Sequence, residues 1–104
     1  MNKRERLSRI KSMLQDAFPQ RLRGVVLYGS EARGTAEPDS DIDLLVLLTG
    51  PVNRRRDLWI CIQALYPLVL ELERPIHAKP VDVEQYEAQK WPLYRDVKRE
   101  GIVA

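Results

Sequence analysis

The sequence predicts an α/β or α+β domain in which a small mixed sheet has its helices mainly on one face. Apolar residues change between helical and strand spacing in the order helix, strand, strand, helix, strand, helix. The 104 residues suit one modest core, so we expect a single domain over 1–104. With 44% hydrophobic and 31% charged residues, the composition is that of an ordinary globular protein.

The first half is predicted to contain one helix and two strands. Residues 3–18 have apolar side chains at helical spacing, which indicates an amphipathic helix. This helix should begin at an Asn2 cap and end before Pro19. Residues 22–28 and 41–48 are short apolar runs bounded by turn residues, as is typical of buried strands.

The second half is predicted to add two helices and a strand. Residues 53–73 form a long helical pattern that Pro67 should kink or divide. Residues 75–83 form a weaker strand whose two prolines favour an edge position. A final helix is expected over about 84–99, with a kink at Pro92. These runs leave both parallel and antiparallel pairing open.

Charge and cysteine content exclude several classes of protein. The net charge of +2 is too near neutral to argue for nucleic-acid binding. We expect the Arg54–Arg56 run to be a solvated face, with contact to phosphates or an acidic partner as the alternative. The lone Cys61 excludes an intramolecular disulfide and is expected to be buried. Without a secretory signal or a membrane span, the expected location is cytoplasmic.

A Gly29-Ser30 pair directly follows the first predicted strand. A glycine at such a turn lets backbone N–H groups approach an anion, and the Ser30 hydroxyl adds a further donor. If residues 30–33 start a helix, its free N–H groups point at the same anion. The simpler alternative is that the pair is only a turn.

Two carboxylates, Asp41 and Asp43, open the second predicted strand. Residues two apart on a strand project from the same face, so these carboxylates should lie side by side. Such a pair repels itself unless a cation lies between, and hard oxygen ligands suit Mg²⁺. The structural alternative is that Asp41 ends the loop and Asp43 pairs with an arginine.

The combination resembles the DNA polymerase beta-like nucleotidyltransferase superfamily. Gly-Ser-Glu-Ala-Arg-Gly at 29–34, a loop, and Ser-Asp-Ile-Asp-Leu at 40–44 are similar to the signature of its smallest branch. That branch comprises the minimal nucleotidyltransferase (MNT) domain proteins, such as the MntA-type antitoxins of HEPN/MNT toxin–antitoxin pairs. Residues 94–102 also resemble the last helix of those proteins.

The resemblance implies a nucleotidyltransferase fold and a set of site residues. Gly29 and Ser30 match the turn that binds the triphosphate of ATP. Asp41 and Asp43 match the aspartates that hold one or two Mg²⁺ ions for attack on the α-phosphorus. Arg33 is a further candidate for a phosphate contact, and a salt bridge to Glu37 or Asp39 is the alternative.

The third acidic residue of the superfamily pattern has no direct match. Its expected position falls near His77, which can serve as a base or a weak ligand. Asp82 is the nearest acid, but on a regular strand it faces opposite to His77. We therefore keep His77 as a candidate catalytic residue and Asp82 as a candidate metal ligand.

The resemblance also implies a partner. MNT proteins pair with a helical HEPN ribonuclease toxin, and some add AMP to a toxin tyrosine. We expect such a partner, a nucleotide triphosphate, no direct DNA binding and a possible homo- or hetero-oligomer. The alternative is a degenerate module that neutralises its partner by binding alone; a small-molecule transferase is less favoured.

Overall fold

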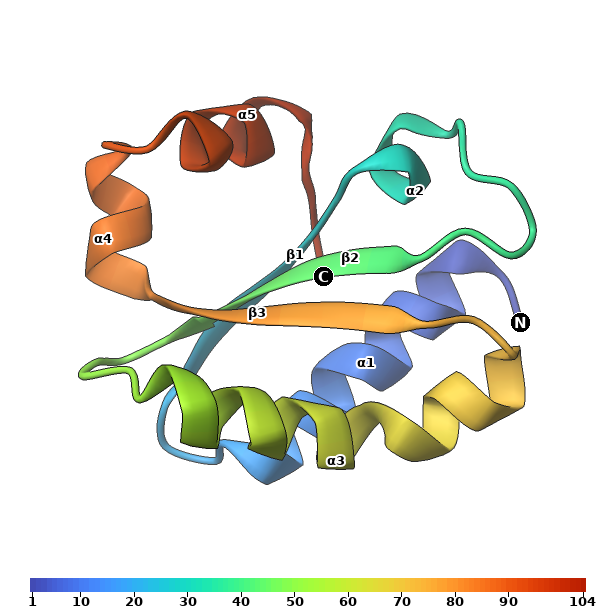
Figure 1. Cartoon of the computed structure of the whole chain (residues 1–104), viewed down its shortest axis with the longest axis horizontal. Helices are drawn as coiled ribbons and strands as arrows, with labels where there is room; N and C mark the ends of the chain where they lie inside the picture. Colours follow the sequence, from blue (N-terminus) through green and yellow to red (C-terminus); the bar gives the residue numbers. More distant parts are fainter.

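The computed structural model describes residues 1–104 as a four-stranded sheet with helices on both faces (Figure 1). In chain order the elements are α1 (Lys3–Ala17), β1 (Leu22–Tyr28), α2 (Ser30–Arg33), β2 (Ile42–Leu48), α3 (Arg54–Leu72), β3 (Ile76–Asp82), α4 (Val83–Ala88), α5 (Pro92–Glu100) and β4 (Ile102–Val103). The predicted fold class is confirmed, and the two longest helices share one face of the sheet. No helix has the length and apolar character needed to span a lipid bilayer.

The sheet is mixed, with the strand order β3-β2-β1-β4. β1 runs antiparallel to both β2 and β4, whereas β2 and β3 are parallel. The edge position predicted for β3 is therefore confirmed. β4 was not predicted, because two residues are too few to show a period-2 pattern.

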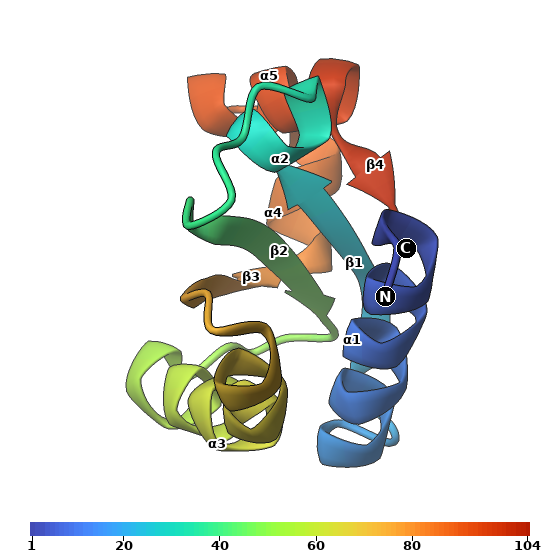
Figure 2. The ribbon, with the colours of Figure 1, turned by 90° about the vertical axis from the view of Figure 1, so that its right-hand side faces the viewer.

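The larger core lies between the sheet and the helices α1 and α3, which lie side by side under it (Figure 2). β2 contributes alternate residues to this core, as a strand with both faces buried should. The members on the helices and on β2 are Leu7, Ile10, Leu14, Cys61, Leu65, Leu68, Ile42, Leu44, Val46 and Leu48. Cys61 is fully buried as predicted, and burial raises its pKa to about 12.

A smaller core lies on the opposite face, under α4 and α5. Its buried members are Val26, Leu45, Leu47, Val81, Tyr86 and Val97. Asp43 is the preceding β2 position on this face, but it lies outside the cluster and keeps 30% of its side-chain surface exposed. The short helices thus leave one end of this face open to solvent.

The prediction of a single helix over 84–99 is wrong, because the chain forms two helices there. α4 ends at Gln89, which has a left-handed backbone (φ 55°), and Pro92 occupies the first position of α5. Proline is favoured at that position because its missing N–H has no partner in the first turn. Pro67, in contrast, lies within an uninterrupted α3.

A buried ion pair joins β1 to the start of α3, at the end of the sheet away from Asp43. Asp57 has no exposed surface, and its two oxygens accept hydrogen bonds from Arg21 at 2.9 and 3.0 Å. The backbone N–H of Asn53 donates a third bond at 3.0 Å. These bonds from Arg21 lower the pKa of Asp57 despite its burial.

Candidate functional site

Two carboxylates and an imidazole meet where β2 begins. Asp43 lies on β2, and its register partners are His77 on β3 and Tyr28 on β1. These three residues therefore share one face of the sheet. β2 begins at Ile42 rather than at residue 41, so Asp41 lies in the last position of the preceding loop.

His77 contacts both aspartates. Its Nε2 lies 3.5 Å from Oδ2 of Asp41, and its Nδ1 lies 3.9 Å from Oδ1 of Asp43. The side chains of His77 and Asp41 are 64% and 46% exposed, so the group is open to solvent. The structure thus brings together Asp41, Asp43 and His77, three of the site residues predicted from the sequence.

Asp82, the other candidate for the third acidic position, lies at the far end of β3. Its register partner is Leu48, five positions beyond the pair formed by Asp43 and His77. Its carboxylate caps α4 by accepting a hydrogen bond of 2.9 Å from the N–H of Glu84. The structure does not bring Asp82 to Asp41 and Asp43, so its assignment as a metal ligand is corrected to a helix cap.

The turn at Gly29 lies directly against the carboxylate of Asp43. Gly29 has φ 76° and ψ −155°, a region of backbone space that is essentially restricted to glycine. A Cβ at this position would lie 2.6 Å from Oδ2 of Asp43, closer than any real contact allows. Only a glycine permits this packing, which brings Ser30 at the start of α2 beside the acidic group.

A buried carboxylate, Glu31, fixes α2 in place. It accepts hydrogen bonds from Arg74 at 2.8 Å and from Arg6 at 2.6 Å, and Lys3 donates to its backbone carbonyl at 3.0 Å. Arg74 also donates at 2.9 Å to the carbonyl of Ser40, in the loop before Asp41. The Gly29-Ser30 turn and the approach to β2 therefore share one anchor, and Arg74 lowers the pKa of Glu31.

Arg33 does not form the salt bridge to Glu37 or Asp39 that we weighed as the alternative. Its nearest carboxylate is Glu100 at the end of α5, at 3.9 Å, and half of the Arg33 side chain is exposed. Its positive charge nevertheless acts on the site, where it offsets a small part of the rise that burial causes in the pKa of Asp43. A phosphate contact remains a prediction.

The electrostatics of the site favour a cation supplied from outside. Burial raises the pKa of Asp43, partly offset by His77, and the nearby Asp41 raises it further. Burial and the charge of Asp43 also raise the pKa of Tyr28. Neither aspartate forms a salt bridge with an arginine or lysine. The alternative in which Asp43 pairs with an arginine is therefore not observed.

These residues fit a hard divalent ion. Asp41 and Asp43 offer oxygen ligands around the same imidazole, and Asp41 and His77 are open to solvent. Mg²⁺ needs only one or two carboxylates, because substrate phosphates and waters complete its coordination. No set of three or more potential ligand residues surrounds a single point, so the pair is the whole acidic contribution of the chain.

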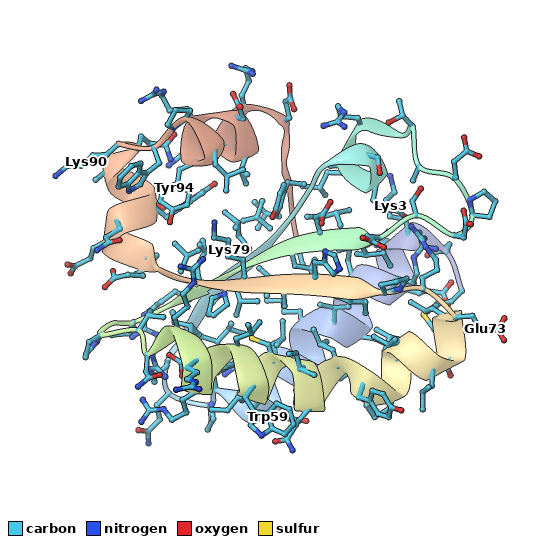
Figure 3. All side chains as sticks on the ribbon, viewed as in Figure 1. Lys3, Trp59, Glu73, Lys79, Lys90 and Tyr94 are labelled. Atoms are coloured by element: carbon cyan, nitrogen blue, oxygen red, sulfur yellow. The ribbon has the colours of Figure 1, made fainter.

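The structure adds functional candidates that the sequence reading missed. Lys79 lies two residues beyond His77 on β3, and it projects from the same face as Val81 of the smaller core (Figure 3). Period-2 alternation from His77 could have identified it. The pairing of Glu31 with Arg74, 43 residues apart, left no local signal.

Comparisons with known proteins agree with this geometry. A provisionally named protein adenylyltransferase of Methanocaldococcus jannaschii is 28% identical over 99% of this chain and 98% of its own. A crystal structure of a toxin–antitoxin with AMP-PNP superposes with a TM-score of 0.69 at 23% identity, over 93% of this chain and 70% of that one.

A spectinomycin adenyltransferase from Enterococcus faecialis, solved with ATP and spectinomycin, superposes with a TM-score of 0.63 at 25% identity. That match covers 86% of this chain and 37% of the other. The profile of the nucleotidyltransferase domain matches residues 7–104, which include the Gly29-Ser30 turn, Asp41, Asp43 and His77. The chain belongs to the nucleotidyltransferase domain family.

Proposed function

We propose that this protein is a Mg²⁺-dependent adenylyltransferase that transfers AMP from ATP to a hydroxyl of a partner protein. The observation that supports it is the packing of the Gly29 turn on the carboxylate of Asp43, with Asp41 and His77 beside it. In the proposed reaction, this turn binds phosphate and the two adjacent carboxylates bind the metal.

Each site residue has a distinct task in this reaction. The Ser30 hydroxyl and the free N–H groups at the start of α2 bind the triphosphate. Asp41 and Asp43 hold Mg²⁺, which when bound neutralises phosphate oxygens and orients the attack. The acceptor oxygen bonds to the α-phosphorus as the bond to pyrophosphate breaks. His77 accepts the proton that the acceptor hydroxyl loses.

We further propose that the acceptor is a tyrosine of a HEPN-type toxin and that the protein acts as an antitoxin. The structures of toxin–antitoxin complexes that share this fold support a toxin partner, one of them with AMP-PNP. The naming of the archaeal relative supports a protein acceptor. The open face beside Asp43 leaves the aspartates accessible to an external hydroxyl.

The test is AMP transfer followed by intact-mass analysis. The protein is incubated with Mg²⁺, ATP and the product of its neighbouring gene, and we expect that product to gain AMP units. Asp43→Asn should slow transfer by about 10³-fold or more, because half of the metal-binding pair is lost. Asp82→Asn is the matched control: it makes the same chemical change, Asn still caps α4, and transfer should continue. Mg-ATP binding without any transfer to this product would reject the proposal.

A second candidate is a module that neutralises its partner by binding alone. The observation that favours it is the imidazole of His77 in place of a third carboxylate. In that case Asp43→Asn should leave toxin neutralisation intact. Loss of neutralisation by this variant, with the complex still formed, would decide against binding alone.

A further inference from the structure

The outward face of α3 carries an apolar seam that nothing in the chain covers. Trp59, Ile62, Tyr66 and Leu70 follow one another at spacings of three or four residues, which places them in one row along a helix. They are 57%, 46%, 55% and 59% exposed. Trp59 points away from the sheet, on the side opposite to the core residues of α3 (Figure 3). We call this row the α3 seam.

The α3 seam ends in opposite charges. Arg55 lies four residues before Trp59 on α3 and so continues the same row. Glu73 is the C-cap residue that follows the helix, so its carboxylate lies at the C-terminal end of the seam. Neither forms a salt bridge or a side-chain hydrogen bond within the chain, and the same is true of Arg54. The remaining charged residues of α3 are paired: Arg56 and Arg21 contact Asp57, and Arg9 pairs with Glu71.

These charges oppose the dipole of their own helix. Three arginines (Arg54, Arg55 and Arg56) open the positive N-terminus of α3, and the one acidic residue of that turn, Asp57, is already neutralised by Arg21. The C-terminal end has Glu71 and Glu73 but no basic residue in the last turn. Such placement destabilises an isolated helix, since cations are favoured at the C-terminus and anions at the N-terminus. An antiparallel helix alongside removes this conflict, because each end then faces an end of opposite charge.

We propose that the α3 seam binds the α3 seam of a second copy of this chain, antiparallel and about a two-fold axis near Ala64. The seam is symmetric in the way this pairing requires: Arg55 faces Glu73, and Trp59 faces Leu70. At the centre, Ile62 faces Tyr66. An isologous contact needs one surface that is complementary to itself under a two-fold rotation, and this row meets that requirement in both polarity and charge.

This pairing leaves the candidate active site free. α3 packs on the face of the sheet opposite to Asp43 and His77 (Figure 2). Two copies joined through α3 therefore expose both sites outward. The proposal is independent of the adenylyl transfer proposed above, and each can fail without the other.

The test measures the oligomeric state of the full chain by sedimentation at concentrations from about 1 to 500 μM. The wild type should dimerise within this range, as expected of an interface limited to one helix pair. Ile62→Glu should weaken the dimer by about 100-fold or more, because it buries a charge at the centre of the seam. The side chain of Ile62 is exposed in the monomer, so its thermal melt should match the wild type.

Charge exchange distinguishes this pairing from any other use of the seam. Arg55→Glu and Glu73→Arg each place like charges together twice in a two-fold dimer, and each should weaken it by about 10-fold. The double variant should restore dimerisation to within about three-fold of the wild type. Arg54→Glu makes the same charge change beside the seam and should have little effect.

Three results would overturn the proposal. The first is a wild type that stays monomeric throughout the range. The second is a dimer that Ile62→Glu leaves intact. The third is a double charge variant that weakens the dimer as much as both single changes together. A monomeric wild type whose binding to a toxin is lost on Ile62→Glu would assign the seam to that partner instead.

Discussion

Asp57 and Asp43 lie toward opposite ends of the sheet, and their pKa values are shifted in opposite directions. Asp57 is fully buried, yet the bidentate bonds from Arg21 hold its pKa below the usual value. Asp43 is less buried but has no arginine partner, and its pKa is raised. Burial alone therefore does not decide the charge state; the partner does.

This difference separates a structural carboxylate from a functional one. The charge of Asp57 is neutralised by a fixed cation of the chain. Under the proposed function, the charge of Asp43 is left for a Mg²⁺ ion that binds from solution. The same contrast holds beside the site, where Arg74 and Arg6 neutralise Glu31.

The largest effect on stability should come from breaking the pair at the structural end. Arg21→Ala leaves Asp57 buried without its cation, so we expect unfolding to become easier by about 3 kcal/mol. Chemical denaturation measures this value. Arg23→Ala is the matched control, because Arg23 lies only two residues further along the chain, is exposed and forms no ion pair. It should change stability by less than about 0.5 kcal/mol. Equal effects of the two changes would contradict a structural role for the pair.

At the functional end, Gly29→Ala should cost stability and nucleotide binding together. The new Cβ meets Oδ2 of Asp43 and sits in glycine-only backbone space, so we expect a loss of about 2 kcal/mol. Gly34→Ala is the control for a positive φ without a steric clash, in the αL region that Glu73 and Gln89 also adopt. Gly34 has the same φ of 76°, but nothing lies within 4 Å of its added Cβ. Calorimetric titration with Mg-ATP should show lost affinity only for Gly29→Ala.

The smallest expected effect is a change in stability that has opposite signs for Asp43→Asn and Asp57→Asn. Asp43→Asn should stabilise the protein at pH 7 by about 0.5 kcal/mol while it abolishes transfer, because it removes an unneutralised charge. Asp57→Asn should destabilise it. Thermal melts of both variants against the wild type measure the two signs, and the same sign for both would contradict the comparison.

The pH dependence of these effects follows from the pKa shifts. The folded pKa of Asp43 is raised above 3.8, so its ionisation costs stability at neutral pH and the gain from Asp43→Asn should vanish below pH 3.8. The folded pKa of Asp57 is lowered from 3.8. Its contribution is therefore present above pH 3.8 and is lost as the pH falls through its folded pKa.

Much of the fold followed from local patterns. The strands β1 and β2 and the helices α1 and α3 were predicted within one or two residues, because their apolar periods are long and their ends have clear stop signals. The α4–α5 break escaped prediction, since Pro92 can either kink a helix or begin one and the sequence does not distinguish these roles. Strand direction also required the structure, because pairing depends on contacts between distant segments.

The candidate site was predictable where it is local. Gly29 and Ser30 lie next to each other, and Asp41 and Asp43 lie two apart, so their spacing alone indicated a shared function. The choice between His77 and Asp82 depended on the register of β3 against β2, which aligns Asp43 with His77. That register is a tertiary property, and a sequence pattern gives only the alternation of faces.

The anchoring of Glu31 by Arg74 also bears on how the site is assembled during synthesis. The Gly29-Ser30 turn is followed by Glu31, whose partner Arg74 lies 43 residues later, just before β3. A ribosome-bound chain that has emerged only through α3 contains both aspartates and the Gly29-Ser30 turn without that anchor. The turn therefore has its full set of contacts only after Arg74 has joined Lys3 and Arg6, and no nascent fragment ending before residue 74 contains the complete site.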